Sequence, residues 1–376
     1  MKKIMTVFGT RPEAIKMASL IQALKKEEKL EPIVVVTAQH REMLDSVLHS
    51  FHIEPDYDLN IMKQGQSLTE VTSRILTQLD DVIKEVRPDM ILVHGDTMST
   101  FAGSLAALYN QVSIGHVEAG LRTWDKYAPF PEEMNRQMVG VMADLNFAPT
   151  VTAAENLRAE RKPESSIVIT GNTAIDAMAY TVRDDYESTV MNRHPGQRVI
   201  LLTAHRRENI GEPMRNIFQA VKNIVDDHSD VTVVYPVHKN PKVRELADKY
   251  LGQHDRIELI EPLEVVDFHN FAQQAHLILT DSGGVQEEAP SLGKPVLVLR
   301  DATERPEGVE AGTLKVVGTE TENIYEATHE LLTDEAVFRA MSEASNPYGD
   351  GHASERIVGH IKYYLGLSKT KPEPFR

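Results

Sequence analysis

The sequence of 376 residues is 41% hydrophobic and 26% charged, and its 56 Asp and Glu outnumber its 40 Lys and Arg, which gives a formal net charge of −16. This composition is typical of a globular protein, and the length exceeds what one ordinary hydrophobic core fills, so we expect two domains. The acidic balance argues against general binding to nucleic acid or to an anionic membrane. The chain has no cysteine, which excludes disulfides, thiolate catalysis, Fe–S clusters and cysteine-ligated zinc.

The chain begins with a short apolar run, 4–8, that ends at Gly9. This run is too short for the core of a signal peptide, and no other stretch approaches the roughly 18 apolar residues of a membrane span. We therefore expect a cytoplasmic protein without a membrane segment.

Apolar runs alternate with helical patterns along the chain. In the first half we expect strands at 4–8, 33–37, 90–93 and 112–117 and helices at 14–24, 43–48, 68–86, 99–109 and 132–142. In the second half we expect strands at 199–203, 231–235, 257–260, 277–280 and 296–299, a final helix at 353–365 and a frayed tail at 369–376. Continuous apolar strands that alternate with helices predict parallel sheets covered on both faces. A helix at 174–183 and a polar stretch at 184–198 separate the two series, so we place the domain boundary between residues 171 and 198.

Polar motifs stand where predicted strands of the first half give way to helices. They are His94-Gly95-Asp96-Thr97, His116-Val117-Glu118-Ala119-Gly120-Leu121-Arg122 and Pro131-Glu132-Glu133-Met134-Asn135-Arg136. The ends of strands are where open α/β sheets bind ligands, so we expect the chemistry here. The earlier turn Gly9-Thr10-Arg11-Pro12-Glu13 offers backbone N–H groups to a phosphate, with Arg11 and Lys16 adding charge. It matches neither the dinucleotide fingerprint nor the P-loop, and an ordinary turn with a solvated arginine is the alternative.

Three features of the second half point to an anionic ligand. His205 and His238 follow successive strands, and His238 is as easily structural as functional. Thr280-Asp281-Ser282-Gly283-Gly284-Val285-Gln286-Glu287-Glu288 joins a strand to a helix through two glycines, so a diphosphate could approach bare N–H groups there, with Glu288 accepting from a ribose and Arg305 near the rim. The alternative is a glycine-rich turn with solvated acids. HExxH, His-x-His and GxSxG patterns are absent, so we expect neither a metal nor a serine hydrolase.

Taken together, six ordered motifs closely resemble the non-hydrolysing bacterial UDP-N-acetylglucosamine 2-epimerases. They are 8–14, 94–97, 116–122, 131–136, 205–209 and 280–288. The resemblance implies two Rossmann-like α/β domains in a GT-B arrangement with the active site in the interdomain cleft, a homodimer, and no metal or nicotinamide cofactor. It also implies that the last helix returns to the first domain, which divides the chain into 1–171 with 354–376, and 172–353.

The family's reaction interconverts UDP-GlcNAc and UDP-ManNAc by eliminating UDP to give 2-acetamidoglucal and adding it back. Breaking the C1–O bond makes positive character at C1, which carboxylates stabilise, and inversion at C2 requires acid/base groups on two faces. By resemblance Asp96, Glu118 and Glu132 are the acid/base and stabilising candidates, and His205 lies near the leaving group. We prefer Glu132 to Glu133 because it is one helical turn from Arg136 and could share its face.

Further positions match by resemblance alone. Nucleotide or phosphate positions are matched by Arg11, Lys16, Arg136, Ser282, Gly283, Gly284 and Glu288, and a uracil-side position by Phe271. Some members bind a second, activating UDP-GlcNAc, and the matching positions here are Gln39, Glu42, Gly65, Glu132, Arg206 and His238. Glu42 stands where we expect glutamine and Gly65 where we expect arginine, so we expect weaker activation. A GT-B glycosyltransferase, a hydrolysing relative and a non-catalytic nucleotide-sugar sensor are the alternatives.

Overall fold

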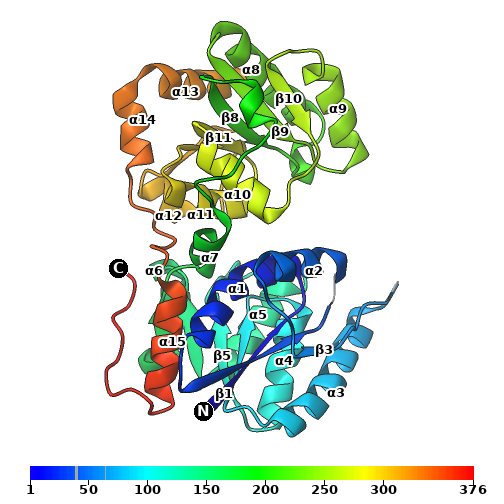
Figure 1. The fold of residues 1–376 in the computed structure, drawn as a ribbon, viewed down its shortest axis with the longest axis vertical. Helices are drawn as coiled ribbons and strands as arrows, with labels where there is room; N and C mark the ends of the chain where they lie inside the picture. The colour runs from blue at the N-terminus through cyan, green and yellow to red at the C-terminus, as the bar shows by residue number, and fades with distance from the viewer. Residues whose placement is uncertain (39–40, 64) are drawn as a thin grey trace. The chain divides into compact units, whose positions relative to one another are not determined.

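The computed structural model describes residues 1–38, 41–63 and 65–376. Within them the chain forms two compact units, unit 1 (Met1–Tyr180 with Gly349–Arg376) and unit 2 (Thr181–Tyr348). Each unit contains one parallel sheet with helices packed on it, as the sequence predicts (Figure 1). Among the described residues no helix is long and apolar enough to cross a membrane.

Unit 1 has a seven-stranded sheet in the order β3-β2-β1-β4-β5-β6-β7. Its strands are β1 (Lys2–Phe8), β2 (Leu30–Val36), β3 (Tyr57–Asp58), β4 (Met90–His94), β5 (Ser113–Val117), β6 (Leu145–Ala148) and β7 (Ile167–Ile169). Its helices are α1 (Arg11–Lys25), α2 (Arg41–Ser50), α3 (Leu68–Val86), α4 (Met98–Tyr109), α5 (Glu132–Met142), α6 (Val151–Ala159), η1 (Glu164–Ser166), α7 (Thr173–Thr181), whose last residue is already in unit 2, and α15 (Ala353–Tyr364).

Unit 2 has a six-stranded sheet in the order β10-β9-β8-β11-β12-β13. Its strands are β8 (Arg198–Thr203), β9 (Val231–Pro236), β10 (Ile257–Ile260), β11 (Leu277–Thr280), β12 (Val296–Val298) and β13 (Leu314–Val316). Its helices are η2 (Met191–Arg193), η3 (Arg207–Asn209), α8 (Glu212–Asp227), α9 (Pro241–Leu251), α10 (Val265–Gln274), α11 (Gly283–Glu288), η4 (Ala289–Leu292), α12 (Pro306–Glu310), α13 (Thr321–Thr333) and α14 (Glu335–Ser342).

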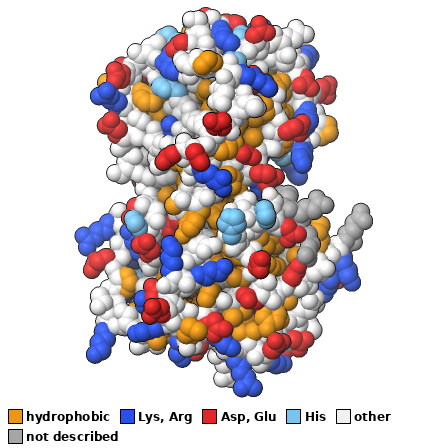
Figure 2. Space-filling view, viewed as in Figure 1, with side chains coloured by type: hydrophobic (Ala, Val, Ile, Leu, Met, Phe, Trp, Pro, Cys, Tyr) orange, Lys and Arg blue, Asp and Glu red, His pale blue; other side chains and the backbone are white. Residues whose placement is uncertain are grey.

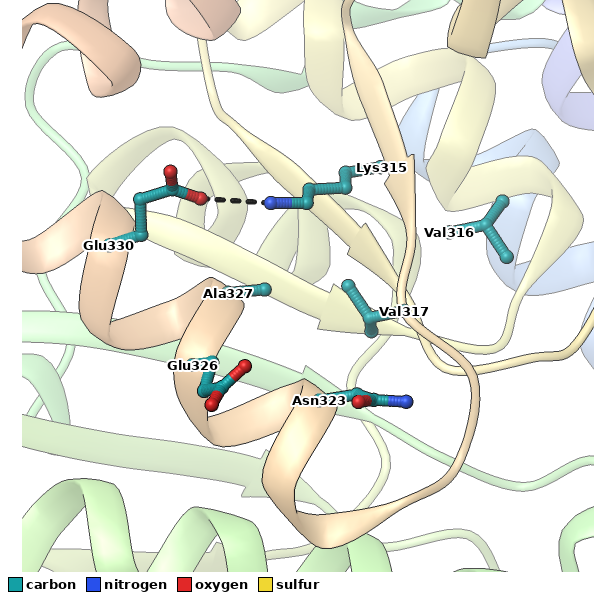
Figure 3. Close-up of a pocket in the computed structure, with 7 residues that line it drawn as sticks. All are labelled: Lys315, Val316, Val317, Asn323, Glu326, Ala327 and Glu330. Carbon is teal, nitrogen blue, oxygen red and sulfur yellow. Dashed lines mark hydrogen bonds and ion pairs between the residues drawn. The ribbon is translucent and has the colours of Figure 1, made fainter.

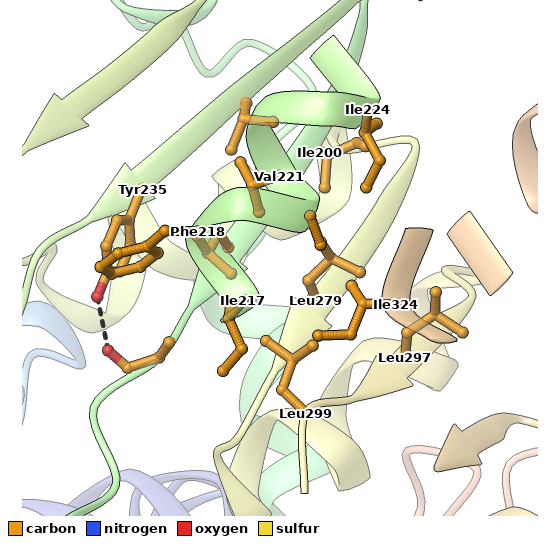
Figure 4. Close-up of a cluster of buried hydrophobic side chains, with 14 of the residues drawn as sticks. Ile200, Ile217, Phe218, Val221, Ile224, Tyr235, Leu279, Leu297, Leu299 and Ile324 are labelled. Atoms are coloured by element: carbon orange, nitrogen blue, oxygen red, sulfur yellow. Dashed lines mark hydrogen bonds between the residues drawn. The ribbon is translucent and has the colours of Figure 1, made fainter. Parts of the chain in front are cut away.

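The core of unit 2 shows how the apolar pattern places the helices. Ile217, Phe218 and Ile324 project from α8 and α13 onto alternate strand residues such as Leu279, and all four are completely buried (Figure 4). Burying each such side chain contributes about 1.5–3 kcal/mol. The hydroxyl of Tyr235 donates to the carbonyl of Ala204 at 2.6 Å, which holds the chain where it leaves β8.

The bounds of α3, α5, β10 and β11 are as predicted, but β3, β6, α6, η1 and β7 of unit 1 were not expected. β6, α6 and β7 lie where the sequence shows a proline-containing connection and a charged segment. β6 and β7 are short, and the buried Asn146 interrupts the apolar run of β6, so periodicity alone does not reveal them.

Contrary to expectation, the C-terminal tail is not frayed. The backbone N–H of Phe375 donates to the carbonyl of Ile169 at 2.8 Å, beside the edge strand β7. The guanidinium of Arg356 lies 5.4 Å from the centre of the Phe375 ring. A cation–π contact and a main-chain hydrogen bond therefore fix the tail on unit 1.

The predicted domain boundary between residues 171 and 172 assigns α7 to the second domain. In the structure, the contacts of α7 place nearly all of this helix in unit 1. Ser19 of α1 donates to the carbonyl of Thr173 at 3.3 Å. The carboxylate of Asp176 accepts hydrogen bonds from the N–H groups of Ala353 (3.2 Å) and Ser354 (2.6 Å). Asp176 thus supports the N-terminus of α15, which also packs on α1.

Candidate active site

Four of the six predicted motifs, 8–14, 94–97, 205–209 and 280–288, lie at the points where the strand order of each sheet reverses, while 116–122 follows β5 and 131–136 spans the start of α5. In unit 1 this point is between β1 and β4, and in unit 2 it is between β8 and β11. Helices that follow such a pair of strands diverge to opposite faces, which leaves a crevice at the carboxyl ends where open α/β sheets bind ligands.

A buried carboxylate fixes the two turns at this point in unit 1. Glu13 accepts hydrogen bonds from the N–H groups of Gly9 (2.9 Å) and Thr10 (2.8 Å), and from the hydroxyl of Thr97 in the turn after β4 (2.6 Å). Burial raises the pKa of Glu13, although the hydrogen bonds favour its charged form. A Cβ at Gly9 would lie 1.9 Å from Oγ1 of Thr37, so only glycine fits there.

Glu118, predicted to be catalytic, follows β5 in a left-handed conformation with φ +61°. This conformation is strained for a residue other than glycine. Oε2 of Glu118 is ion-paired with Lys16, accepts a hydrogen bond from Nδ2 of Asn172 at 3.3 Å, and lies 3.7 Å from Nε2 of His94. Burial lowers the pKa of His94 to about 4, so its imidazole is neutral at pH 7. Asn172, which lies just before α7, is not among the site residues predicted from the sequence.

Asp96, in the turn after β4, accepts a hydrogen bond from Nη1 of Arg136 at 3.2 Å. Its side chain is 27% exposed. Burial raises the pKa of Asp96 to about 6; the charges of Glu118 and Glu132 act in the same direction, while Arg136 and Lys16 oppose them. Asp96 can therefore take up or release a proton near neutral pH. Three carboxylates predicted to be catalytic thus influence one another electrostatically.

The residue that binds Arg136 is Glu133, not Glu132. Glu133 is completely buried, and its Oε2 accepts from Nε of Arg136 at 2.7 Å. It also accepts from the N–H groups of Thr123 (3.0 Å) and Trp124 (3.1 Å). Burial opposes its ionisation, but these hydrogen bonds outweigh burial and lower the pKa of Glu133 to about 2. The pairing with Arg136 therefore does not support the choice of Glu132, which stays a prediction; the half-buried side chain of Glu132 acts on Asp96 by charge.

Two other motif residues of unit 1 have structural partners. His116 is completely buried, and its Nε2 lies 2.7 Å from the carbonyl oxygen of Gly95. Burial lowers the pKa of His116 to about 3. The side chain of Arg122 is also fully buried and binds Glu160 through Nε at 2.6 Å. Arg11 lies half-buried at the start of α1.

In unit 2 a second buried carboxylate joins the turns after β8 and β11. Oδ2 of Asp281 accepts from the N–H groups of His205 and Arg206, both at 2.8 Å, and from Nδ2 of Asn209 at 3.0 Å. Oδ1 of Asp281 lies 3.3 Å from Nδ1 of His205. The ring of His205 stacks on that of His238, with the centres 5.4 Å apart. The structure thus brings the two predicted histidines together.

The glycine turn that begins α11 is flanked by guanidinium groups. A Cβ at Gly283 would lie 3.5 Å from Nη2 of Arg305 and 3.7 Å from Nη2 of Arg206. Arg305 also forms an ion pair with Glu287. Bare N–H groups at a helix N-terminus beside two cations are suited to a diphosphate. Ser282 is the N-cap residue of this helix.

The remaining predicted positions are less closely grouped. The ring of Phe271 is 3% exposed and packs in the core, 6.3 Å from the ring of Tyr186. Gly65 lines a pocket of about 340 Å³ together with Lys63, Arg74 and four further residues. Gln39 and the side chain of Glu42 lie outside the described residues.

A second concavity, of about 510 Å³, lies between the edge strand β13 and α13 (Figure 3). It is bordered by the ion pair between Lys315 and Glu330 at 2.9 Å, and no predicted site residue lines it. In the described part of the chain, no three His, Cys, Asp or Glu side chains gather as metal ligands. Acidic and basic side chains are interspersed on the visible face of each unit (Figure 2).

Comparison with known proteins gives concordant matches. Residues 22–362 match the family described as UDP-N-acetylglucosamine 2-epimerase. A UDP-N-acetylglucosamine 2-epimerase from Bacillus subtilis is 63% identical over 99% of this chain and 98% of that protein. The structure of MnaA from S. aureus with UDP is 66% identical, with a TM-score of 0.91 over the whole of both chains. The UDP-GlcNAc 2-epimerase from Neisseria meningitidis bound to UDP-GlcNAc is 48% identical over 96% of this chain and 99% of that chain, with a TM-score of 0.84. These likenesses confirm the predicted class of two Rossmann-like α/β domains of the GT-B type.

Proposed function

The chain belongs to the UDP-N-acetylglucosamine 2-epimerase family, and from this premise we propose that it interconverts UDP-GlcNAc and UDP-ManNAc without net hydrolysis. It is an isomerase. The proton on C2 leaves, the C1–O bond breaks and UDP departs, which gives 2-acetamidoglucal with a C1–C2 double bond. A proton then returns to the opposite face of C2 and UDP adds back to C1, so that atoms and charge balance. The product would supply ManNAc units for cell-envelope polysaccharide.

The observation that carries this proposal is the grouping of carboxylates with cations at the strand ends of unit 1. Asp96, with its pKa raised to about 6, is suited to proton transfer near neutral pH. Glu118 is held by Lys16 in a fixed orientation and Glu132 lies near enough to act on Asp96 by charge. Carboxylates placed around a sugar can stabilise the positive character that develops at C1.

Unit 2 supplies the groups suited to the departing UDP. The hydroxyl of Ser282 and the backbone N–H groups of Gly283 and Gly284 would hold the diphosphate, with Arg206 close by, and His205 would stand at the leaving oxygen. Glu288 would accept hydrogen bonds from the ribose. Unit 1 would add cationic contacts to the nucleotide through Arg11, Lys16 and Arg136. Phe271, which is buried, would pack behind the uracil-binding side of the site.

Hydrogen exchange at C2 tests the proposal. In proton NMR of UDP-GlcNAc with the protein in D2O, we expect deuterium at C2 together with UDP-ManNAc. Free ManNAc with UDP would indicate a hydrolysing enzyme, and transfer of the sugar without C2 exchange a GT-B glycosyltransferase. Unchanged substrate with tight binding would support the nucleotide-sugar sensor and refute the proposal.

We further propose that activation by a second UDP-GlcNAc is weak in this protein. The candidate positions are Gln39, Glu42, Gly65, Glu132, Arg206 and His238. An anion at Glu42 and the lack of a cation at Gly65 disfavour a second anionic ligand. We expect a rate in the UDP-ManNAc to UDP-GlcNAc direction that rises little with added UDP-GlcNAc. Steep activation at low micromolar UDP-GlcNAc would contradict this.

A homodimer is also part of the proposal. Apolar side chains are exposed at the C-terminal ends of the adjoining helices α4 and α5, namely Leu108 (47%), Tyr109 (67%) and Val141 (77%). Exposed apolar side chains that lie together are typical of interaction surfaces. Sedimentation equilibrium should give twice the chain mass for the wild type and a lower mass for Tyr109→Glu; a monomeric wild type would refute the dimer.

A further inference from the structure

The imidazole of His269 lies between the end of α7 and the carboxylate proposed to bind the ribose. His269 is 2% exposed. Its Nδ1 is 2.7 Å from the hydroxyl of Thr181, and its Nε2 is 3.4 Å from Oε2 of Glu288. The side chain of Glu288 is 18% exposed, so part of its carboxylate remains accessible. A buried histidine with both nitrogens facing polar partners has a fixed ring orientation.

The segment that carries Thr181 is itself fixed to α10. Nδ2 of Asn270 donates to the carbonyl of Thr181 at 2.7 Å, and its Oδ1 accepts from the N–H of Arg183 at 2.8 Å. Asn270 is 1% exposed. The two hydrogen bonds from Asn270 therefore hold the backbone of Thr181 in place, so its hydroxyl contacts His269 from a fixed position.

The two oxygens of Glu288 have different surroundings. Oε2 faces His269, whereas Oε1 lies 3.9 Å from the position of a Cβ at Gly284, in the turn proposed to hold the diphosphate. A glutamate side chain without such a neighbour samples several rotamers, and ordering it into one rotamer costs conformational entropy. A contact to one oxygen reduces this cost and leaves the other oxygen toward the glycine turn.

We propose that His269 is a positioning residue which, held by Thr181, orients the carboxylate of Glu288 to accept hydrogen bonds from the ribose hydroxyls of a uridine nucleotide. This inference rests on the proposed function, because Glu288 is the ribose acceptor only in a nucleotide-binding site. A carboxylate receives two vicinal hydroxyls only if its plane is oriented toward both. His269 touches neither the nucleotide nor the sugar in this arrangement.

Calorimetric titration of the full-length protein with UDP and with 2′,3′-dideoxy-UDP tests the proposal, because only UDP carries the ribose hydroxyls. We expect His269→Phe to raise the Kd for UDP about tenfold, and the Kd for the dideoxy compound less than about twofold. Glu288→Gln should show the same pattern, and the double variant should lose no more than either single variant. Equal weakening for both ligands, or no weakening for either, would overturn the proposal.

Conservative and matched variants separate positioning from packing. Thr181→Val should reproduce the selective loss for UDP, and Thr181→Ser should restore wild-type binding because it keeps the hydroxyl. His276 is a half-buried histidine of the same unit that stacks on Phe338, with the ring centres 4.3 Å apart, and His276→Phe should leave both Kd values unchanged. If Thr181→Val distinguishes UDP from the dideoxy compound as well as His276→Phe does, Thr181 does not orient Glu288 through His269. This outcome refutes the proposal even if His269→Phe does not fold.

The failure of this inference is distinguishable from failure of the proposed function. If the wild type prefers UDP to the dideoxy compound and the variants behave as expected, His269 positions Glu288 even when C2 exchange is absent. If C2 exchange occurs but Glu288→Gln binds both ligands as the wild type does, the epimerase stands and the role of His269 is refuted.

Discussion

Replacing Glu133 with glutamine tests the distinction between the two adjacent glutamates at the start of α5. Glutamine has the same shape but presents an NH2 group in place of one oxygen. Both oxygens of Glu133 accept from donors, including Arg136 and the N–H groups of Thr123 and Trp124. One of these donors would then face another donor in a fully buried position, and Arg136 would lose its buried counter-charge.

The size of the effect follows from the pKa of Glu133, which lies at about 2 in the folded protein against an ordinary value of 4.5. This difference corresponds to roughly 3 kcal/mol of stability in favour of the folded, ionised form. Because the folded pKa is depressed, the contribution is complete above pH 4.5 and is lost as the pH falls toward about 2. We therefore expect Glu133→Gln to lower the free energy of unfolding by about 3 kcal/mol at pH 7, and by less at pH 3.5.

Trp124 provides the assay, since it is the only tryptophan of the chain and its backbone N–H donates to Glu133. Its fluorescence during urea unfolding reports on unit 1, which avoids averaging over two units. Glu132→Gln is the matched control, and we expect its stability to change by no more than about 0.5 kcal/mol while turnover falls. If Glu132→Gln were the destabilised variant, or both variants unfolded like the wild type, the assignment of the buried partner to Glu133 would be refuted.

Three further variants test the geometry of unit 1. Asp96→Asn should raise the free energy of unfolding by about 2 kcal/mol at pH 7.5. The raised pKa of Asp96 means that the wild type loses stability as the pH rises through about 6, and asparagine carries no charge to bury. No gain in stability at pH 7.5 would show that burial does not oppose the charge of Asp96. Glu118→Gln should keep UDP binding and lose most turnover, and near wild-type turnover would remove its catalytic role. Gly9→Ala should destabilise unit 1 by at least about 1 kcal/mol in urea unfolding, since its Cβ would overlap Thr37; unchanged stability would mean that the turn can shift.

The sequence is informative where one physical rule decides the structure. Continuous apolar runs predict the strands, and polar residues just after them predict the site, because ligands bind at strand ends. The choice between Glu132 and Glu133 is different, since residues three and four positions before Arg136 both face it on a helix. Only the backbone N–H groups of the preceding loop, which converge on Glu133, decide which of the two binds Arg136.

Sequence patterns also cannot predict contacts between residues that are far apart in the chain. Asn172 donates to Glu118 from 54 positions away, and His269 meets Thr181 from 88 positions away. Neither residue has a local signal that distinguishes it from an ordinary cap or core residue. The tail is a similar case, because its two prolines indicate an irregular segment but not that Phe375 will contact Arg356.

Glu13 and Asp281 indicate how such a site can be held in place. Each is a buried acid that joins the two turns at the point where its sheet reverses strand order: Glu13 accepts hydrogen bonds from both turns, and Asp281, itself in the turn after β11, accepts them from the turn after β8. These turns belong to strands that are neighbours in the sheet but distant in the chain, so no helix or hairpin joins them. An unpaired buried carboxylate is costly, which means that each acid is stable only while its donors stay in position. Most of those donors are backbone N–H groups, so each acid fixes the chain itself, and the proposed functional side chains beside it, such as Arg11 and His205, are positioned from that backbone.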